Sequence, residues 1–144
     1  MIRKAVTLAG ACLLLCLVHT PASFAEDTLV FIDVVGASGD GDKALAAALS
    51  ERLLSHGLAI AGTPTPNAYE IQGIVKLGPA KKGRQAVRID WTILGPDGAQ
   101  LGNVTQEQEV RQGSLDRKWG GAAEAAAVAA ARDILKLIPT EPLQ

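Results

Sequence analysis

The strongest constraint on the fold is residues 28–57, where an apolar strand, a glycine-rich turn and an amphipathic helix follow one another. Residues 29–35 are apolar and often β-branched except for Asp33. This pattern is typical of a strand inside a sheet that is buried on both faces or nearly so. Residues 36–41 then carry three glycines, which reach backbone angles closed to other residues. The chain is therefore expected to turn there and to begin a helix.

The helix that follows is predicted from the spacing of its leucines. They recur every four residues and form one apolar stripe: Leu45, Leu49 and Leu53. Asp40 and Asp42 stand at the amino end, where carboxylates accept hydrogen bonds from free amide groups and meet the positive end of the helix dipole. Both acids are therefore predicted to cap the helix. Gly57 is the expected stop, and His56 is expected to complement the carboxyl end.

The next residues are predicted to form a short strand at 59–61 and then an antiparallel meander. Residues 69–77 and 87–93 alternate apolar and polar side chains, which predicts strands with one buried and one wet face. The turn sequences at residues 79–83 and 95–98 are short enough to reverse the chain. Trp91 falls on the apolar side of its strand and is expected in the core.

The last strand of the meander is expected at residues 99–110. It is polar at nearly every position and carries Gln106, Glu107, Gln108 and Glu109 in a row. Charged side chains are typical of edge strands, which they protect against pairing with another chain. This strand is therefore predicted to lie at an edge of the sheet.

A second helix is predicted for residues 119–138. Its small and aliphatic side chains share one side: Ala123, Ala127, Ala130, Ile134 and Leu137. Because alanines keep that side narrow, the helix is expected to lie close to the sheet or to the first helix. The predicted fold class is α/β (α+β), a two-layer sandwich with a mixed sheet of four or five strands and two helices on one face. The predicted order is β-α-β-β-β-β-α.

The first 25 residues have the pattern of a signal peptide. Arg3 and Lys4 precede an apolar run at residues 5–18, and Ser23 and Ala25 are small residues in the positions that a signal peptidase reads. The run is shorter than the roughly 20 residues that cross a bilayer as a helix. We therefore expect export by the Sec route, cleavage after Ala25 and a location in the periplasm.

Cleavage there defines the mature chain. It leaves a single domain at residues 26–138 and a short tail at residues 139–144. Cys12 and Cys16 leave with the signal peptide, so neither a disulfide nor a thiolate metal site is expected. Two alternatives stay open: retention of the signal as a membrane anchor, and acylation of Cys12 in a lipoprotein-like box.

The mature chain is mildly acidic. Removing Arg3 and Lys4 leaves 12 basic and 15 acidic residues, a formal charge of −3. Such a charge provides no field that attracts nucleic acid. No nucleic-acid partner is therefore expected.

The mature chain offers little catalytic chemistry. His56 is its single histidine, and no serine lies in a nucleophile-elbow motif. Three acids near the first turn lack the ordered spacing of a calcium loop: Asp33, Asp40 and Asp42. The turn also lacks the lysine of a phosphate-binding loop. Strands could bring the acids Asp90 and Glu107 together, but a solvated face of mixed charge explains them better. No enzymatic activity, catalytic residue, cofactor or metal is therefore expected.

The candidates for contact with a partner are surface charges and one tryptophan. The predicted partner-binding residues are Trp119, Glu107, Glu109, Arg88, Lys81 and Lys82. Lys81 and Lys82, with Arg84, form a basic tip between two strands that suits an acidic partner or anionic lipid head groups. Trp119 stands where the second helix begins. It is predicted either to cover the edge of the core or to be an interaction anchor in a groove.

The order of these segments resembles a known family of envelope domains. The segments that carry the resemblance are VFIDVVG, the Gly/Asp turn, KALAAALSERLLSHG, AYEIQGIV, QAVRIDWTILGPDGAQLG and the alanine-rich helix. Together they resemble the amino-terminal-type domain of the TolB family of periplasmic proteins. The pattern is similar in the penicillin-binding-protein activator LpoB and the curli secretion lipoprotein CsgG. The resemblance covers nearly all of the mature chain.

This resemblance implies a two-layer α/β domain of the bacterial cell envelope that is not an enzyme and binds another protein. The chain lacks a convincing counterpart of the acylated cysteine of the lipoprotein members, which favours a periplasmic protein without a stable membrane anchor. The favoured function is an accessory or adaptor domain that binds a cell-envelope protein through its polar sheet face or its edge strand. The alternative is a small periplasmic binding protein for an envelope lipid or glycan. A buried apolar pocket between helices and sheet would favour that alternative.

Overall fold

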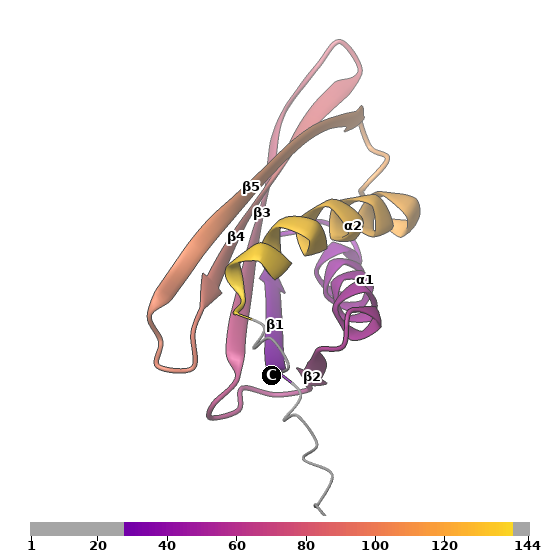
Figure 1. The fold of residues 1–144 in the computed structure, drawn as a ribbon. Helices are drawn as coiled ribbons and strands as arrows, with labels where there is room; N and C mark the ends of the chain where they lie inside the picture. The colour runs from indigo at the N-terminus through magenta and orange to yellow at the C-terminus, as the bar shows by residue number, and fades with distance from the viewer. Residues whose placement is uncertain (1–27, 140–144) are drawn as a thin grey trace, which may run out of the picture.

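The computed structural model describes residues 28–139 of the chain (Figure 1). Its elements, in order, are β1 (Leu29–Val35), α1 (Gly41–Ser55), β2 (Ala59–Ala61), β3 (Tyr69–Lys81), β4 (Arg84–Leu94), β5 (Gln100–Arg111) and α2 (Gly120–Leu137). This is the predicted order. The predicted signal peptide, its cleavage site and nearly all of the predicted tail lie outside the described residues. Within 28–139, neither helix has the length and apolar character needed to cross a membrane.

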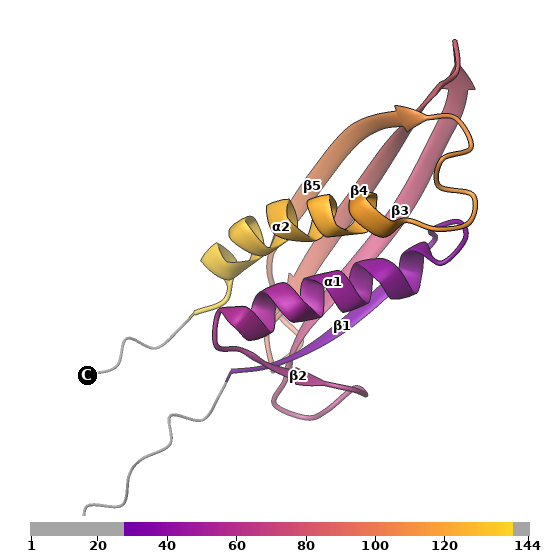
Figure 2. The same cartoon turned by 90° about the vertical axis from the view of Figure 1, so that its right-hand side faces the viewer.

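The strands form one mixed sheet with the order β2-β1-β3-β4-β5. β1 pairs in parallel with β2 and β3, whereas β3, β4 and β5 form the predicted antiparallel meander. Both helices lie side by side on one face of the sheet (Figure 1, Figure 2). The fold is therefore the predicted two-layer sandwich, and β5 is an edge strand as predicted.

β1 has one buried face and not two. Val30 and Val34 are buried beneath the helices, but Asp33 is exposed and Val35 has 49% of its surface accessible. The prediction of a strand buried on both faces was wrong, because both helices pack on the same side of the sheet. The opposite side, which we call the open face, is left uncovered by any described helix.

The core lies between the helices and the sheet. The leucine stripe of α1 is buried, and α1 is followed by Gly57 with a φ of 87° as the predicted stop. The buried side chains of α2 are Ala123, Ala126, Ala127, Ala130, Ala131 and Ile134. The alanines allow α2 to contact α1 as well as β4 and β5, which agrees with the narrow side predicted for this helix.

Trp91 is fully buried on β4, as predicted. Its ring lies on Gly73 of β3, where an added Cβ would be 2.5 Å from the ring atom Cζ3. Its Nε1 donates a hydrogen bond to Oε1 of Gln106 (2.8 Å), and Nε2 of Gln106 donates to the backbone oxygen of Ala126 (3.0 Å). These two bonds tie β4 and β5 to α2.

The turn between β1 and α1 is tied to the start of α2. Oδ1 of Asp40 accepts a hydrogen bond from the Trp119 amide (2.8 Å), and the Ser38 backbone oxygen accepts one from the Trp119 indole (2.8 Å). Oδ1 of Asp42 accepts from the Ala37 amide (2.8 Å). The capping hydrogen bonds predicted for the two acids were therefore wrong, because these carboxylates hold the turn. Asp42 still lies in the first turn of α1, where its charge complements the helix dipole.

Candidate functional site

The sheet is longer than the helix layer, and the excess forms a projecting arm. β3 has 13 residues and α1 has 15, yet a strand rises about 3.3 Å per residue and a helix only about 1.5 Å. The strand therefore spans about 43 Å and the helix about 22 Å. We define the arm as residues 76–88 of β3 and β4 with residues 107–111 of β5, and the body as the rest of the described chain. Figure 1 and Figure 2 both show the arm extending past α1 and α2.

The tip of the arm is a two-residue turn. Lys81 pairs with Arg84, and the residues between them, Lys82 (φ 51°) and Gly83 (φ 74°), both have positive φ. Two such residues in succession are typical of a type I′ turn, whose twist matches that of the flanking strands. The Gln112 amide donates a hydrogen bond to the Gly83 backbone oxygen (2.9 Å). This bond holds the end of β5 beside the tip.

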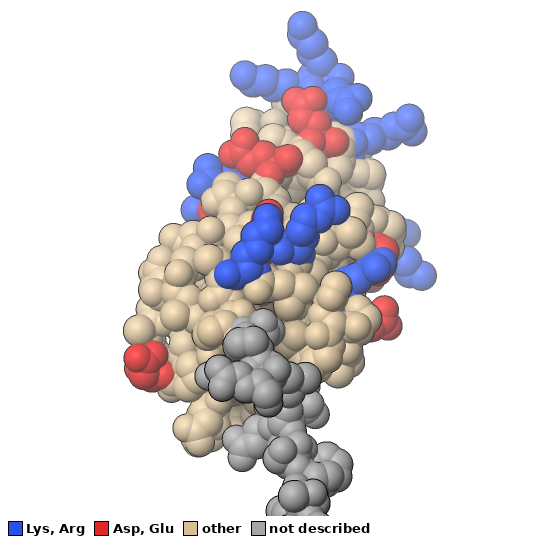
Figure 3. Space-filling view, in the orientation of Figure 1, with Lys and Arg blue, Asp and Glu red and all other residues tan. Residues whose placement is uncertain are grey.

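The arm concentrates positive charge. Its basic residues, all exposed, are Lys76, Lys81, Lys82, Arg84, Arg88 and Arg111. Its only acids are Glu107 and Glu109, so the arm has a net charge of +4. The remaining sequence after Ala25 has 6 basic and 13 acidic residues, a net charge of −7. Figure 3 shows Lys and Arg side chains gathered at the end of the molecule formed by the arm.

Two pairs of like charges face each other across strands of the arm. Lys76 on β3 is directly opposite Arg88 on β4, and Arg84 on β4 is directly opposite Arg111 on β5. Like charges in this position destabilise a sheet. The arm therefore concentrates like charges at some cost to the sheet, and such a local conflict is typical of a functional surface.

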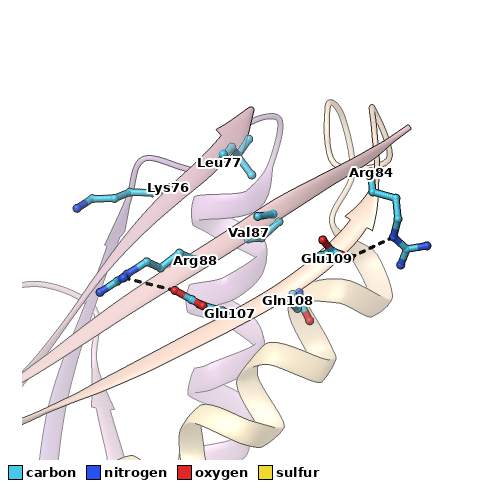
Figure 4. Close-up of a pocket in the computed structure, with 10 residues that line it drawn as sticks. Lys76, Leu77, Arg84, Val87, Arg88, Glu107, Gln108 and Glu109 are labelled. Carbon is cyan, nitrogen blue, oxygen red and sulfur yellow. Dashed lines mark hydrogen bonds and ion pairs between the residues drawn. The ribbon is translucent and has the colours of Figure 1, made fainter. Parts of the chain in front are cut away.

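Each of these pairs contains an arginine that also contacts an acid on β5. Nε of Arg84 is 3.3 Å from Oε2 of Glu109, and Nη1 of Arg88 is 3.4 Å from Oε1 of Glu107 (Figure 4). All four side chains are at least half exposed, and ion pairs of this kind contribute only about 0–1 kcal/mol. Among residues 28–139, no ion pair involves the other four cations of the arm: Lys76, Lys81, Lys82 and Arg111.

Arg88 also binds Asp90, at the border between arm and body. Thr105 donates a hydrogen bond to Oδ1 of Asp90 (2.9 Å), and this bond is the main reason that the pKa of Asp90 is lowered. Partial loss of solvent opposes the shift, while Arg88 at 3.1 Å and the charge of Lys76 reinforce it. Asp90 and Glu107 thus share one guanidinium, which makes them members of an ion-pair network. In the described part of the chain, no three His, Cys, Asp or Glu side chains are grouped closely enough to hold a metal ion.

A hollow of about 790 Å³ lies on the arm below its tip (Figure 4). Two of its lining residues, Gly78 and Ala86, have almost no side chain, and a Cβ added to Gly78 would be 3.4 Å from that of Ala86. Its charged lining consists of Lys76, Arg84, Arg88, Glu107 and Glu109. A recess with small residues and charged neighbours can admit a side chain of another molecule.

Two apolar side chains are exposed on the open face beside the arm. Val35 of β1 and Ile74 of β3 are direct neighbours in the sheet, with 49% and 46% of their surfaces accessible. Asp90 of β4 lies opposite Ile74 on its other side. The open face therefore places a small apolar patch next to the charged arm.

The structure brings five of the six predicted partner residues together on the arm: Lys81, Lys82, Arg88, Glu107 and Glu109. Trp119 is not among them, because only 2% of its surface is accessible. Its indole lies on Gly41, where an added Cβ would be 2.5 Å from the ring. The prediction of Trp119 as a surface anchor was wrong, since the segment before α2 folds onto the turn before α1. Its other predicted role, at the edge of the core, is the one observed.

Four residues of the arm and of the neighbouring apolar patch were not predicted from the sequence: Lys76, Arg111, Val35 and Ile74. If the two flanking strands are paired residue by residue outward from the turn at residues 95–98, Arg111 lies close to Arg84. The proximity of these two arginines could therefore have been predicted. Ile74 breaks the alternation of its strand, which was a second signal. Val35 gave none, because an apolar run does not reveal which face a helix layer covers.

The comparisons with known proteins bear on the fold. No family model and no curated protein matches the chain. A crystal structure described as an uncharacterized protein is similar with a TM-score of 0.54 and 14% sequence identity, over 74% of this chain and 91% of that one. The lipoprotein GNA1162 from Neisseria meningitidis has a TM-score of 0.48 and 10% identity, over 76% of this chain and 99% of its own. The likeness to the first structure supports the α/β fold and extends no further.

Proposed function

We propose that this chain is a non-enzymatic periplasmic accessory or adaptor domain that binds another cell-envelope protein. The observation that carries the proposal is the arm, a long three-stranded projection that contributes only Val87, Leu77 and Val110 to the core. Its surface holds six exposed cations, four of which face a like charge across the strands. A projecting surface that costs stability and contributes little to the core suits a binding role.

The open face supports the same proposal. Protein interfaces combine an apolar centre with a polar and charged rim. Val35 and Ile74 provide exposed apolar area, and the ion-pair network of Arg88, Asp90 and Glu107 lies beside them. β5 adds a strand of 12 residues at the edge of the sheet, to which an extended segment can add a further strand.

The proposed location rests on the sequence. The first 25 residues have the pattern of a Sec signal peptide, and the order of the later segments resembles the TolB family of periplasmic domains. We therefore expect the mature protein to begin at Glu26. Mass spectrometry of the protein recovered from cells tests this expectation. An acylated Cys12 or an intact amino terminus would contradict it.

The binding function is tested by photo-crosslinking in cells. A crosslinking amino acid is placed at Ile74 on the open face and at Glu107 on the arm, since Trp119 is buried. Glu51, which is exposed on α1, is the matched control position. We expect Ile74 and Glu107 to capture the same envelope protein and Glu51 to capture none. Absence of any protein adduct at both positions would overturn the proposal.

A second candidate function has one observation in its favour. A hollow of about 340 Å³ lies between β5 and α2, lined in part by Val87, Ile89, Ala126 and Ala129. Its volume is at the lower end of the range of small-molecule sites, about 300–1,000 Å³. A small binding protein for an envelope lipid or glycan would carry such a ligand through purification. Native mass spectrometry of the protein isolated from its periplasm distinguishes the two functions, because only the second predicts a bound lipid or glycan.

A further inference from the structure

We infer that the arm recognises an acidic segment of a protein, whose carboxylates enter the hollow and bind the cations around it. The inference rests on the proposed function, because it names the chemistry of the partner at that same site. Three observations carry it: the separation of charge in the molecule, the exchangeable ion pairs of the arm, and the recess beneath the tip.

The separation of charge favours an acidic partner. The arm has a net charge of +4, whereas the rest of the mature sequence has −7. An acidic segment is therefore repelled by most of the molecule and attracted by one end of it. Charge arranged in this way raises association rates and suppresses other orientations, more than it adds to affinity.

The ion pairs of the arm suit an exchange of carboxylates. Arg84 and Arg88 hold Glu109 and Glu107 at 3.3 and 3.4 Å, distances longer than the 2.7–2.9 Å typical of a strong charged hydrogen bond. The guanidinium group has five donors and binds carboxylates in a fork. An incoming carboxylate can therefore replace or join each β5 acid without leaving a buried charge unpaired.

The lysines extend this site to the tip. Lys81 and Lys82 are exposed and have no ion pair among the described residues. Together with Arg84 they place three cations within four consecutive positions, 81–84. An extended acidic segment that runs from the hollow to the tip therefore passes the cations of the hollow and then those of the tip.

The shape of the arm favours a protein over a lipid surface. Gly78 and Ala86 leave a recess that a single side chain can enter. The tip, from Pro79 to Arg84, carries no large apolar side chain that could insert into a bilayer.

The experiment compares two variants of the mature chain with matched charge. The arm variant is Lys81→Glu with Lys82→Glu and Arg84→Glu. The control variant is Lys43→Glu with Arg132→Glu and Lys136→Glu, which changes the net charge equally at exposed positions on α1 and α2. Circular dichroism first establishes that both variants are folded. The probe is a fluorescent poly-glutamate peptide at low salt, and its anisotropy reports binding.

We expect the unaltered chain and the control variant to bind the peptide alike, and the arm variant to lose about tenfold or more in affinity. The inference is overturned if the unaltered chain does not bind the peptide, or if both variants lose affinity equally. It is also overturned if vesicles of phosphatidylethanolamine and phosphatidylglycerol bind in an arm-dependent way while the peptide does not.

Crosslinking from Glu107 separates this inference from the proposed function. We expect the arm variant to lose the adduct that the unaltered chain forms in cells. If the adduct persists undiminished in the arm variant, the inference of an acidic partner segment is wrong, but the proposed adaptor function is not contradicted. If no envelope protein is captured even by the unaltered chain, the proposed function itself fails.

Discussion

β3, β4 and β5 run through both the body and the arm, but their side chains are packed differently in the two regions. In the body, alternate residues of β4 are buried beneath the helices, and Trp91 is fully enclosed. In the arm, the strands continue beyond the helix layer, and side chains such as Arg84 and Ala86 are exposed. The stabilising contacts are therefore concentrated where the helices pack on the sheet. The projecting part of the sheet has fewer such contacts and can carry charged side chains for recognition. Substitutions in the two regions should therefore have separable effects.

The largest effect is expected in the body, from Trp91→Ala. The substitution removes a fully buried ring from its contact with Gly73 and leaves Gln106 without its indole donor. Loss of a buried aromatic side chain typically costs about 3–5 kcal/mol in the free energy of unfolding. Urea denaturation followed by circular dichroism measures it. Lys82→Ala on the arm is the control and should change stability by less than about 0.5 kcal/mol. Similar losses in the two variants would contradict the division into body and arm.

A smaller loss is expected from Gly39→Ala, in the turn that is tied to α2. Gly39 has a φ of 58°, and an added Cβ would lie 2.3 Å from the Arg117 backbone oxygen. Strain of this kind costs about 1–3 kcal/mol. Gly62→Ala is the matched control, because Gly62 has nothing within 4 Å of an added Cβ. The difference in thermal midpoint between the two variants measures the effect, and equal midpoints would show that the contact between turn and α2 is dispensable.

A gain is expected on the arm, from Lys76→Glu. The new carboxylate lies directly opposite Arg88 and replaces a repulsive pair with an attractive one, which outweighs the loss of the weaker attraction between Lys76 and Asp90. Cross-strand pairs of opposite charge contribute about 0.2–1 kcal/mol, so the variant should resist urea slightly better than the unaltered chain. The same variant should capture less of the envelope partner in cells. Lys76→Gln, which only removes the repulsion, should lie between the two in stability. A variant that is less stable than the unaltered chain would show that Lys76 supports the fold.

The sequence predicted the body better than the arm, for physical reasons. The periodicity of the leucines in α1 and the alternation around Trp91 report burial directly, so the helices, strands and their order could be predicted. The length of the arm was underestimated, because the strand was predicted at residues 69–77 with a turn at residues 79–83, whereas β3 continues to Lys81. The sequence could not decide between the two predicted roles of Trp119, since its burial depends on bonds to Ser38 and Asp40, about 80 residues earlier in the chain. The apolar patch on the open face was missed, because the apolar run of β1 does not state that Val35 lies on the side of the sheet away from the helices.

The smallest effect is expected at Asp90, where the arm joins the body. The hydrogen bond from Thr105, and then the charges of Arg88 and Lys76, lower the pKa of this carboxyl below its ordinary value of 3.8. The folded chain therefore favours the ionised form more than the unfolded chain does. This contribution to stability is fully present above the unfolded-state pKa and is lost as the pH falls through the lower pKa of the folded state. Asp90→Asn should thus be slightly less stable than the unaltered chain at neutral pH, and the difference should shrink below about pH 4. Urea midpoints measured for both proteins across this range test the sign. A difference that does not vary with pH would mean that the ionised carboxylate is not the stabilising species.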